Sequence, residues 1–337
     1  MESKKIYVLC PIGLKTGGPE LLHQLVYQIN KIFGKRNAVI AYTGDFQNNR
    51  PVKEYEKYIG KEWINADEIK DEEKNIVIFP ETSLSLWNKY KYVTKYIWWL
   101  SVDNYLVTSS FKYNLKNWGF LRTIVHFMKG NIKNYSKQIN SADLNLCQSY
   151  YAESFLRNKS IPDSKIVYLS DYINDLYVRN SDVAQKMSKN DIILYNPKKG
   201  LKFTQRLIQS SKSKKWKWIP LINLTNEEVK RYLEHSKVYI DFGNHPGKDR
   251  FPREAAILGC CVLTDKKGAA NYYNDVPIKD KYKFEDVEEN IPKITQTIDY
   301  CINNYNDAIL DFKNYRDYIK GEKLSFIDDV TKIFKDK

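Results

Sequence analysis

The chain has 337 residues, of which 42% are hydrophobic and 14% aromatic, so it is long enough for two domains of ordinary size. No stretch reaches the roughly 18 uncharged apolar residues of a membrane-spanning helix, so the sequence predicts a globular protein. The formal net charge of +13 favours polyanionic partners such as nucleic acid, anionic lipid or phosphorylated small molecules, without choosing among them.

The first ten residues lead directly into a strand-like pattern, without the apolar stretch and cleavage site of a secretory signal. We therefore expect a cytoplasmic protein. The cysteines form no Cys-x-x-Cys pair and lie near no histidine pattern, which is typical of reduced core residues. No zinc-ligand cluster, catalytic triad or Walker loop is present, so we expect neither a metal ion nor a cofactor.

Short apolar runs alternate with amphipathic stretches along the chain, a pattern typical of βα units and parallel sheets. The N-terminal half holds six predicted strands, at residues 5–10, 37–43, 75–79, 95–101, 144–148 and 165–169. Between the first two, residues 19–33 place their leucine, valine and isoleucine side chains on one helical face. The pattern predicts a doubly wound, Rossmann-like domain over residues 1–175.

Residues 104–140 interrupt this pattern, because the segment is too long for an ordinary βα connection and mixes aromatic with basic residues. Four interpretations stay open: a lid, an acceptor-binding insertion, a patch that contacts an anionic membrane surface, or a helical excursion packed on the domain. His126 lies in this segment, where a lone histidine is more often packed or exposed than catalytic.

A second series of elements follows a predicted linker at residues 174–190. Strands are expected at residues 191–195, 216–221, 238–242 and 261–264, and helices at 200–211, 226–236 and 252–258. Thr225 and Glu228 have the spacing of a capping box, which marks the start of the middle helix. This series predicts a second Rossmann-like domain over residues 190–290. The remaining segment, 291–337, is expected to be helical over 291–318 and 323–334.

The most informative stretch is residues 238–264, where a strand, a polar loop, a short helix, a glycine and another strand follow closely. Pro252 suits the first helical position and Gly259 suits the helix end. The start of such a helix directs backbone N–H groups toward the loop after the strand, where an anionic phosphate can bind. Lys248 and Arg250 add two cations beside it.

Glu254 falls in the first turn of the same predicted helix. Its carboxylate can accept two hydrogen bonds from a ribose or sugar hydroxyl pair, although favourable interaction with the helix dipole alone would also explain a glutamate there. The loop is unusually crowded with charge, which favours the ligand role. Its charged residues are Lys248, Asp249, Arg250, Arg253 and Glu254.

The run PREAAILGCCVLTDKKGAANYY, residues 252–273, resembles the C-terminal signature of retaining GT-B glycosyltransferases that use nucleotide sugars. In that family a glutamate opens a small-residue helix, and a later glycine loop closes the donor pocket. The resemblance implies that Glu254 binds the donor ribose and that Gly268 approaches the diphosphate. The rest of the glycine loop would be Ala269, Ala270 and Asn271.

Two further segments carry the same resemblance. LYNPKKGLKF, residues 194–203, is similar to the turn where the family places a Lys-Gly pair against the donor phosphates, which implies Lys199, with Lys198 as a second cation. TGGPELLHQLV, residues 16–26, is similar to the family's N-terminal Gly-Gly loop. Gly17 and Gly18 would then let the backbone approach the donor phosphate or the acceptor.

The chain departs from the family pattern at two positions. An earlier glutamate usually stands eight residues before Glu254, but Pro246 occupies that place and Asp249 is the nearest carboxylate. The arginine that usually precedes the Lys-Gly pair falls at Leu194.

Glu81 and Asp103 each follow a predicted strand of the first domain, whose carboxyl end faces the cleft between the domains in a GT-B protein. Asp103 lies where related enzymes often carry a histidine near the reacting carbon, so the resemblance makes it the first catalytic candidate. Either carboxylate could instead cap a helix. His245, beside the predicted phosphate loop, is the better placed of the two histidines considered.

The resemblance implies an α/β protein of the GT-B class with two Rossmann-like domains and a helical C-terminal tail. It implies transfer of a sugar, with retention, from a nucleotide sugar to a glycan, glycolipid or other acceptor, in bacterial surface polysaccharide or glycoconjugate assembly. Lysine and arginine would stabilise the departing nucleoside diphosphate in place of a metal ion.

Two alternative functions stay open. One is a sugar-nucleotide epimerase or polyol-phosphate transferase with the same fold. The other is a basic nucleic-acid-binding protein, which the lack of a recognised binding motif disfavours, so nucleic acid is not an expected partner.

Overall fold

The computed structural model describes residues 4–179 and 181–335, and these residues form two compact units. Unit 1 contains the described residues up to Asp171 together with residues 325–335, and unit 2 is Tyr172–Leu324. The described part of the predicted linker lies within unit 2, where it forms the short helices α8 (Asp175–Val178) and α9 (Ser181–Ala184).

Unit 1 is built on a sheet of parallel strands in the order β3-β2-β1-β4-β5-β6-β7. Their bounds are β1 (Ile6–Pro11), β2 (Ala38–Thr43), β3 (Trp63–Asn65), β4 (Ile76–Pro80), β5 (Thr94–Trp99), β6 (Leu144–Cys147) and β7 (Ile166–Tyr168). β4 is buried at every position, as expected for a strand covered on both faces. The strand order reverses between β1 and β4, which is the doubly wound arrangement predicted from the sequence.

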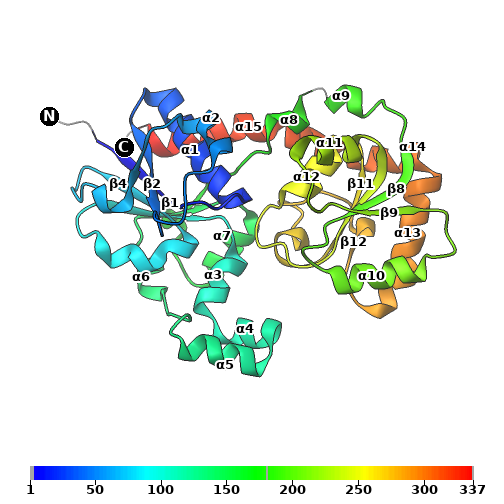
Figure 1. Ribbon diagram of the computed structural model, residues 1–337, viewed down its shortest axis with the longest axis horizontal. Coiled ribbons are helices and arrows are strands. Elements are labelled where there is room, and N and C mark those ends of the chain that lie inside the picture. The colour runs from blue at the N-terminus through cyan, green and yellow to red at the C-terminus, as the bar shows by residue number, and fades with distance from the viewer. Residues whose placement is uncertain (1–3, 180, 336–337) are drawn as a thin grey trace. The chain divides into compact units, whose positions relative to one another are not determined.

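Helices and short 3-10 turns connect these strands. Their bounds are α1 (Gly17–Phe33), η1 (Lys53–Tyr55), α2 (Glu56–Ile59), η2 (Ala66–Glu68), η3 (Glu81–Lys89), α3 (Val102–Ser109), α4 (Phe111–Trp118), α5 (Phe120–Met128), α6 (Ser136–Ser141), α7 (Tyr150–Asn158) and η4 (Asp163–Lys165). The segment 104–140, which interrupts the βα pattern of the sequence, is therefore mostly helical, with a non-helical stretch at residues 129–135 between α5 and α6. Within it, α4 and α5 pack on each other across Gly119 and stand away from the sheet of unit 1 (Figure 1).

Unit 2 contains a second parallel sheet, with the strand order β12-β11-β10-β8-β9. Its strands are β8 (Asn190–Tyr195), β9 (Lys217–Pro220), β10 (Ser236–Asp241), β11 (Cys261–Asp265) and β12 (Lys283–Phe284). Here the order reverses between β8 and β10, so the second domain repeats the doubly wound principle, as predicted.

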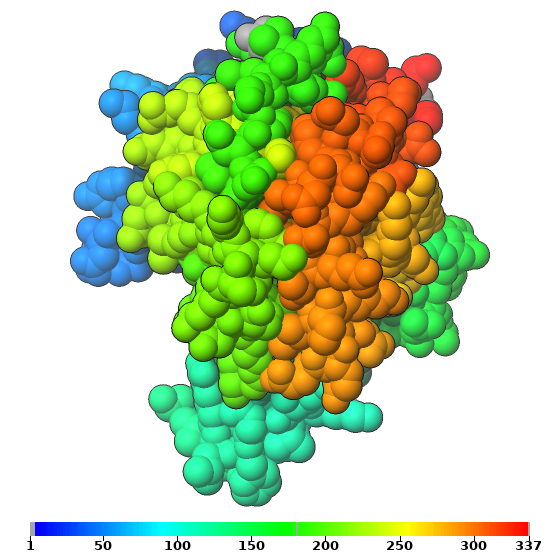
Figure 2. Space-filling view, turned by 90° about the vertical axis from the view of Figure 1, so that its right-hand side faces the viewer, coloured from blue at the N-terminus to red at the C-terminus, as the bar shows by residue number. Residues whose placement is uncertain are grey.

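The helices of unit 2 follow the sequence prediction closely. They are α10 (Leu201–Ser210), α11 (Asn226–Glu234), α12 (Arg250–Ile257), η5 (Gly268–Asn271), η6 (Asp280–Tyr282), η7 (Glu288–Asn290), α13 (Ile291–Asn303), α14 (Tyr305–Ala308) and η8 (Ile309–Phe312). The capping box of Thr225 and Glu228 is confirmed, with bonds in both directions. Figure 2 shows α10 and α13 side by side on the surface of this unit.

Three helix predictions differ from the structure. The segment expected to be one helix over residues 291–318 is interrupted at Asn304, between α13 and α14. α12 begins at Arg250 instead of Pro252, because Asp249 has the extended N-cap conformation and Pro252 still falls in the first turn, where its missing N–H is tolerated. α15 (Lys313–Phe334) runs without the predicted break at residues 319–322. Among the described residues, no helix combines the length and the apolar character needed to cross a bilayer.

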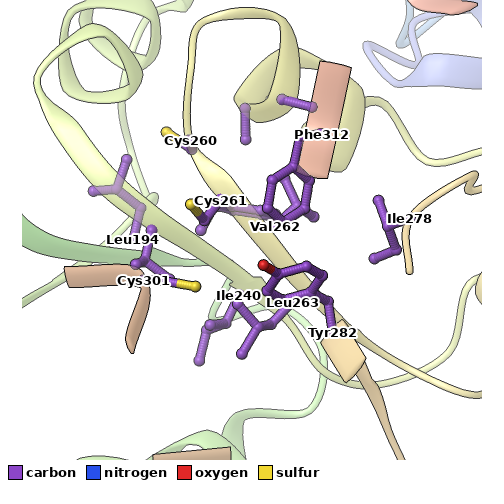
Figure 3. Close-up of a cluster of buried hydrophobic side chains, with 14 of the residues drawn as sticks. Leu194, Ile240, Cys260, Cys261, Val262, Leu263, Ile278, Tyr282, Cys301 and Phe312 are labelled. Carbon is purple, nitrogen blue, oxygen red and sulfur yellow. The ribbon is translucent and has the colours of Figure 1, made fainter. Parts of the chain in front are cut away.

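The core of unit 2 is centred on β11, whose residues are all buried (Figure 3). Side chains from the neighbouring strands and helices surround it, among them Leu194, Ile240, Cys301 and Phe312. All five cysteines of the chain are buried and free, which confirms their prediction as reduced core residues.

Candidate functional site

The loops after β8 and β10 leave the sheet of unit 2 at its switch point and approach each other at backbone distance. Gly200, with φ +60, ends the first loop, and a Cβ on it would lie 1.7 Å from the carbonyl oxygen of Phe242. Gly243, with φ +123, occupies the second loop, and a Cβ there would lie 2.7 Å from the Gly200 nitrogen. Only glycine fits at either position, so this crossing fixes where the neighbouring side chains lie.

Lys199 directs its ammonium group to two carboxylates at this crossing. Its Nζ lies 3.2 Å from Oδ1 of Asp241, the last residue of β10, and it also donates to Asp249. Burial alone would lower the pKa of Lys199, but the charges of Asp241 and Asp249 outweigh burial and raise it. The ammonium is therefore held in its charged form.

His245 joins the same cluster from the loop after β10. Its Nδ1 lies 2.7 Å from Oδ2 of Asp249, and its Nε2 lies 3.1 Å from the Asp241 carbonyl oxygen. Burial and the Lys199 charge lower the pKa of His245, but the hydrogen bond and negative charge of Asp249 dominate, so the net shift is upward. Burial opposes ionisation of Asp249 in turn, yet Lys199 and His245 hold its pKa far below the usual range.

Asp265 supplies a third carboxylate from the end of β11. Its oxygens accept hydrogen bonds from the Gly243 and Lys267 backbone N–H groups at 2.7 and 3.1 Å, and Oδ1 lies 3.5 Å from His245 Nε2. Burial raises the pKa of Asp265 to about 6, although His245 and the two backbone bonds oppose this rise. The strand ends therefore carry a dense charged cluster, defined here as the Lys199 cluster: Lys199, Asp241, His245, Asp249 and Asp265.

One ligand atom each of Asp241, His245 and Asp249 lies within 4.8 Å of the others, a spacing that a metal ion would accept. Lys199 already contacts both aspartates of this group. The Lys199 ammonium is therefore a positive charge that the chain itself places between these two aspartates.

The start of α12 lies directly beside the Lys199 cluster. Asp249 is the N-cap residue by backbone conformation, but its side chain makes no cap hydrogen bond, because it is engaged with Lys199 and His245. The Asp249 carboxylate therefore does not accept a hydrogen bond from the first turn, where the helix dipole favours an anion. Arg250 is the first residue of this turn and is partly exposed.

Lys248 and Arg253 flank the same loop, but their charged groups face Glu322 of α15. Arg253 donates to both carboxylate oxygens of Glu322 at 3.1 and 3.0 Å, and Lys248 Nζ lies 3.0 Å from one of them. All three side chains are almost fully buried. Arg253 also donates to the Lys248 carbonyl oxygen, so this triad holds the loop on α15.

The predicted glycine loop lies against the His245 segment. Gly268 has φ +53, and a Cβ on it would lie 2.0 Å from the His245 carbonyl oxygen, while the Ala269 N–H donates to that oxygen at 2.8 Å. Ala270 is buried and Asn271 is exposed. Glu254 is buried in the second turn of α12 instead of the predicted first turn, because the helix begins two residues earlier than predicted, at Arg250. Lys198 is exposed beside Lys199.

Glu81 and Asp103 lie at the carboxyl ends of β4 and β5 in unit 1. Glu81 is buried, and its Oε2 accepts a hydrogen bond from the Leu100 N–H at 3.0 Å. Burial raises the pKa of Glu81 to about 7, although backbone hydrogen bonds at Leu100 oppose the rise. Asp103 accepts a hydrogen bond from the Tyr151 hydroxyl at 3.0 Å.

The helix-cap interpretation of Asp103 is wrong, because Ser101 is the N-cap of α3 and accepts from the Asn104 N–H. Gly17 and Gly18 form the first turn of α1, whose N-cap Thr16 makes no side-chain cap bond. His126 lies on the α4–α5 hairpin, where its ring contacts Trp118.

The structure thus brings together many of the residues singled out in unit 2 and adds others. Lys199, His245 and Asp249 form one cluster, and the Gly268 loop contacts it. Sequence reasoning missed Asp241, Asp265 and Glu322. A signal for the two aspartates was present, since the neighbouring strands VYID and CVLTD both end on aspartate.

Comparison with known proteins gives results at the level of structure. Neither protein-family models nor curated proteins match the chain. Solved structures resemble it over almost its full length. HepE of Anabaena, in complex with UDP-glucose, has a TM-score of 0.63 at 11% identity, covering 99% of this chain and 100% of HepE. Sucrose-phosphate synthase of Thermosynechococcus elongatus has a TM-score of 0.65 at 10% identity, with 99% and 98% covered.

A third similar structure is the apo form of the lipopolysaccharide outer core galactosyltransferase WaaB, with a TM-score of 0.58, 12% identity, and 99% and 100% covered. These proteins are GT-B glycosyltransferases. At such low identity the likeness concerns the fold, and the chain has the GT-B fold of two Rossmann-like domains, as the sequence resemblance implied.

Proposed function

We propose that the chain is a glycosyltransferase that binds the nucleoside diphosphate of a nucleotide sugar at the switch point of unit 2. The observation that carries this proposal is the start of α12, where the N-cap residue Asp249 makes no cap hydrogen bond with its side chain and pairs with Lys199 and His245 instead. A helix start is a favourable place for phosphate, and Arg250 adds a cation at the first position of this one. HepE, which has the same fold, was solved with UDP-glucose.

The residues of unit 2 fall into two groups under this proposal. Arg250, Lys198 and Lys199 would contact the phosphates, and Glu254 would accept hydrogen bonds from ribose or sugar hydroxyls. The loop Gly268–Asn271 would lie along the diphosphate. Lys248 and Arg253 would act through the loop that they hold on Glu322, since their charges are directed to that carboxylate.

Catalysis would rest on electrostatic stabilisation of the departing nucleoside diphosphate. The cations beside α12 would supply that charge without a metal ion. Asp103 and Glu81 of unit 1, and His245 of unit 2, are the candidates for orienting the sugar and the acceptor. We propose a glycan or lipid-linked acceptor, retention of configuration, and a place in bacterial surface polysaccharide or glycoconjugate assembly.

Thermal unfolding in the presence of nucleoside diphosphates and nucleotide sugars tests the donor site, since a ligand that binds the folded state raises the melting temperature. We expect Arg250→Gln to weaken binding by about tenfold to a hundredfold, because a charge-assisted hydrogen bond contributes about 1.5–3 kcal/mol. Arg231→Gln is the control, since Arg231 is exposed on α11. Equal affinity of both variants would remove Arg250 from the site.

Glu254→Gln tests the hydroxyl contact. The change is nearly isosteric, so we expect an unchanged melting temperature without ligand, with weaker donor binding and slower turnover. Donor analogues that lack the ribose hydroxyls should bind the wild type and the variant equally. If the variant loses stability and keeps its kinetics, Glu254 acts only on the helix.

A further inference from the structure

The α4–α5 hairpin carries an unusual concentration of exposed apolar side chains. Residues 111–128 are about a twentieth of the chain, yet they hold seven of the 21 large hydrophobic residues that are exposed among the described residues. These seven are Phe111, Leu115, Phe120, Leu121, Val125, Phe127 and Met128. Single exposed apolar residues are ordinary, whereas a cluster marks an interaction surface.

Within α5 the apolar side chains are on the outer face. Leu121, Val125 and Met128 follow the spacing i, i+4, i+7 that places them on one side of a helix, and they are 80%, 52% and 80% exposed. Thr123, a polar residue on the opposite side, is completely buried. Because α5 packs with its polar Thr123 inward, its apolar stripe is exposed and can contact an apolar partner outside the protein.

The charge around this stripe has one sign. From residue 104 to residue 142 the sequence contains no Asp or Glu, but it contains six cations: Lys112, Lys116, Arg122, Lys129, Lys133 and Lys137. Arg122 and Lys129 are seven residues apart, so they form a row on the flank of the apolar stripe. Apolar side chains bordered by cations are the pattern of helices that lie in the interface of an anionic bilayer.

The hairpin is braced from within by aromatic contacts. The rings of Phe111 and Phe127 meet edge to face with their centroids 5.7 Å apart, and the Arg122 guanidinium lies 4.9 Å from the centre of the Trp118 ring. The Asn114 side chain is buried and donates to the Val107 carbonyl oxygen, which joins α4 to α3. The stripe on α5 is thus presented by a folded scaffold.

We propose that the α4–α5 hairpin is a membrane-binding surface that inserts Leu121, Val125 and Met128 into the headgroup region of an anionic bilayer. Arg122 and Lys129 contact the lipid phosphates at the same depth. A second copy of the chain is a poorer occupant, because a symmetric interface would bring this all-cationic segment against itself.

Vesicle sedimentation with the full chain tests the proposal. We expect binding to vesicles of equal parts phosphatidylglycerol and phosphatidylcholine, and little binding to phosphatidylcholine alone. The double variant Leu121→Asn, Met128→Asn should reduce binding by about tenfold or more, because two apolar side chains no longer enter the bilayer. The matched control is Leu310→Asn, Leu324→Asn, since these leucines are 65% and 69% exposed elsewhere on the surface.

A second arm of the experiment tests the charge. The double variant Arg122→Gln, Lys129→Gln should weaken binding to the anionic vesicles and reduce its dependence on salt. Equal binding of the wild type to both kinds of vesicle, or equal binding of both leucine variants, would overturn the proposal. So would a dimer in light scattering that only Leu121→Asn, Met128→Asn dissociates.

Thermal melts of all variants verify that the fold is retained. The measurement needs neither donor nor acceptor, so its failure would leave the proposed transferase activity untouched.

Discussion

Each sheet has a carboxylate near its switch point, and the pKa values of the two are shifted in opposite directions: Glu81 is buried in unit 1, and Asp249 is partly exposed in unit 2. In unit 1, Glu81 is buried against backbone N–H groups, and its pKa rises to about 7. In unit 2, Asp249 is held by Lys199 and His245, and its pKa falls. Burial acts in the same direction at both sites, so the difference comes from the neighbouring cations.

This contrast separates two chemical capacities. A carboxyl group with a pKa near neutrality can give or take a proton at physiological pH. A carboxylate locked in an ion pair keeps its charge and fixes the position of its partner. We therefore expect proton transfer and acceptor orientation to belong to unit 1, and charge stabilisation to unit 2.

Loss of the Lys199 ammonium group should lower the free energy of unfolding more than any of the changes described below. Lys199→Gln leaves the buried Asp241 without the counter-ion described above, and removal of one partner of a buried ion pair typically costs about 3–5 kcal/mol. Chemical denaturation measures this loss. The adjacent Lys198→Gln is the matched control, because Lys198 is exposed. Equal effects at the two neighbouring lysines would end the contrast between the two sites.

Glu81 should make the free energy of unfolding fall as the pH rises. Its folded pKa of about 7 exceeds the ordinary 4.5, so the unfolded chain releases this proton first as the pH rises. Stability is therefore lost between pH 4.5 and pH 7, by about 3 kcal/mol in total. Glu81→Gln should remove this slope in denaturation series, whereas Glu62→Gln, at an exposed side chain, should retain it. A Glu81→Gln profile parallel to the wild type would contradict the assignment.

The glycines of the two sites should respond differently to alanine. In Gly200→Ala, the new Cβ would meet the Phe242 carbonyl oxygen in a left-handed backbone conformation, so we expect a loss of more than about 2 kcal/mol. In Gly18→Ala, the nearest atom would be a Leu100 methyl group at 3.7 Å, so stability should stay the same or rise by up to about 1 kcal/mol.

Kinetics of the Gly18→Ala variant then give a separate readout. Slower turnover at full stability would mean that a bound molecule, and not the fold, requires glycine at this helix start. Normal turnover would remove Gly18 from the donor and acceptor contacts.

The smallest effect on stability is expected at Asp103. Asp103→Asn should lower turnover far more than donor affinity, because a residue that touches only the reacting sugar or the acceptor acts mainly in the transition state. Tyr151→Phe is the control, since it removes the same hydrogen bond at a cost of about 1 kcal/mol while it leaves the carboxylate in place. Similar turnover in both variants would reduce Asp103 to a structural partner of Tyr151.

Much of the fold could be predicted because local patterns determine it. Buried parallel strands read as continuous apolar runs, and the capping box at Thr225 and the glycine at residue 259 mark helix ends through backbone chemistry alone. The edge strands Trp63–Asn65 and Lys283–Phe284 were missed. Each has at most three residues, too few to show a period.

The candidate site could be predicted only in part, because the orientation of its charged side chains depends on contacts that no local sequence pattern contains. The loop residues from Lys248 to Glu254 are crowded in the sequence itself, so they attract attention together. Which of them face inward depends on partners far along the chain. Glu322 lies 69 residues after Arg253, and no local sequence pattern predicts that it forms ion pairs with Arg253 and Lys248.

The last helix has a consequence for the order in which the protein is made. α15 begins in unit 2, but its residues from Ser325 onward belong to unit 1, where Phe326 stacks on Trp98 and Phe334 meets Tyr96 of β5. A ribosome delivers these residues only after all of unit 2 has emerged. During synthesis, Tyr96 and Trp98 of β5 therefore stay uncovered until α15 is complete. Unit 2, which follows in the chain, already has all of its own residues at that point and can fold first.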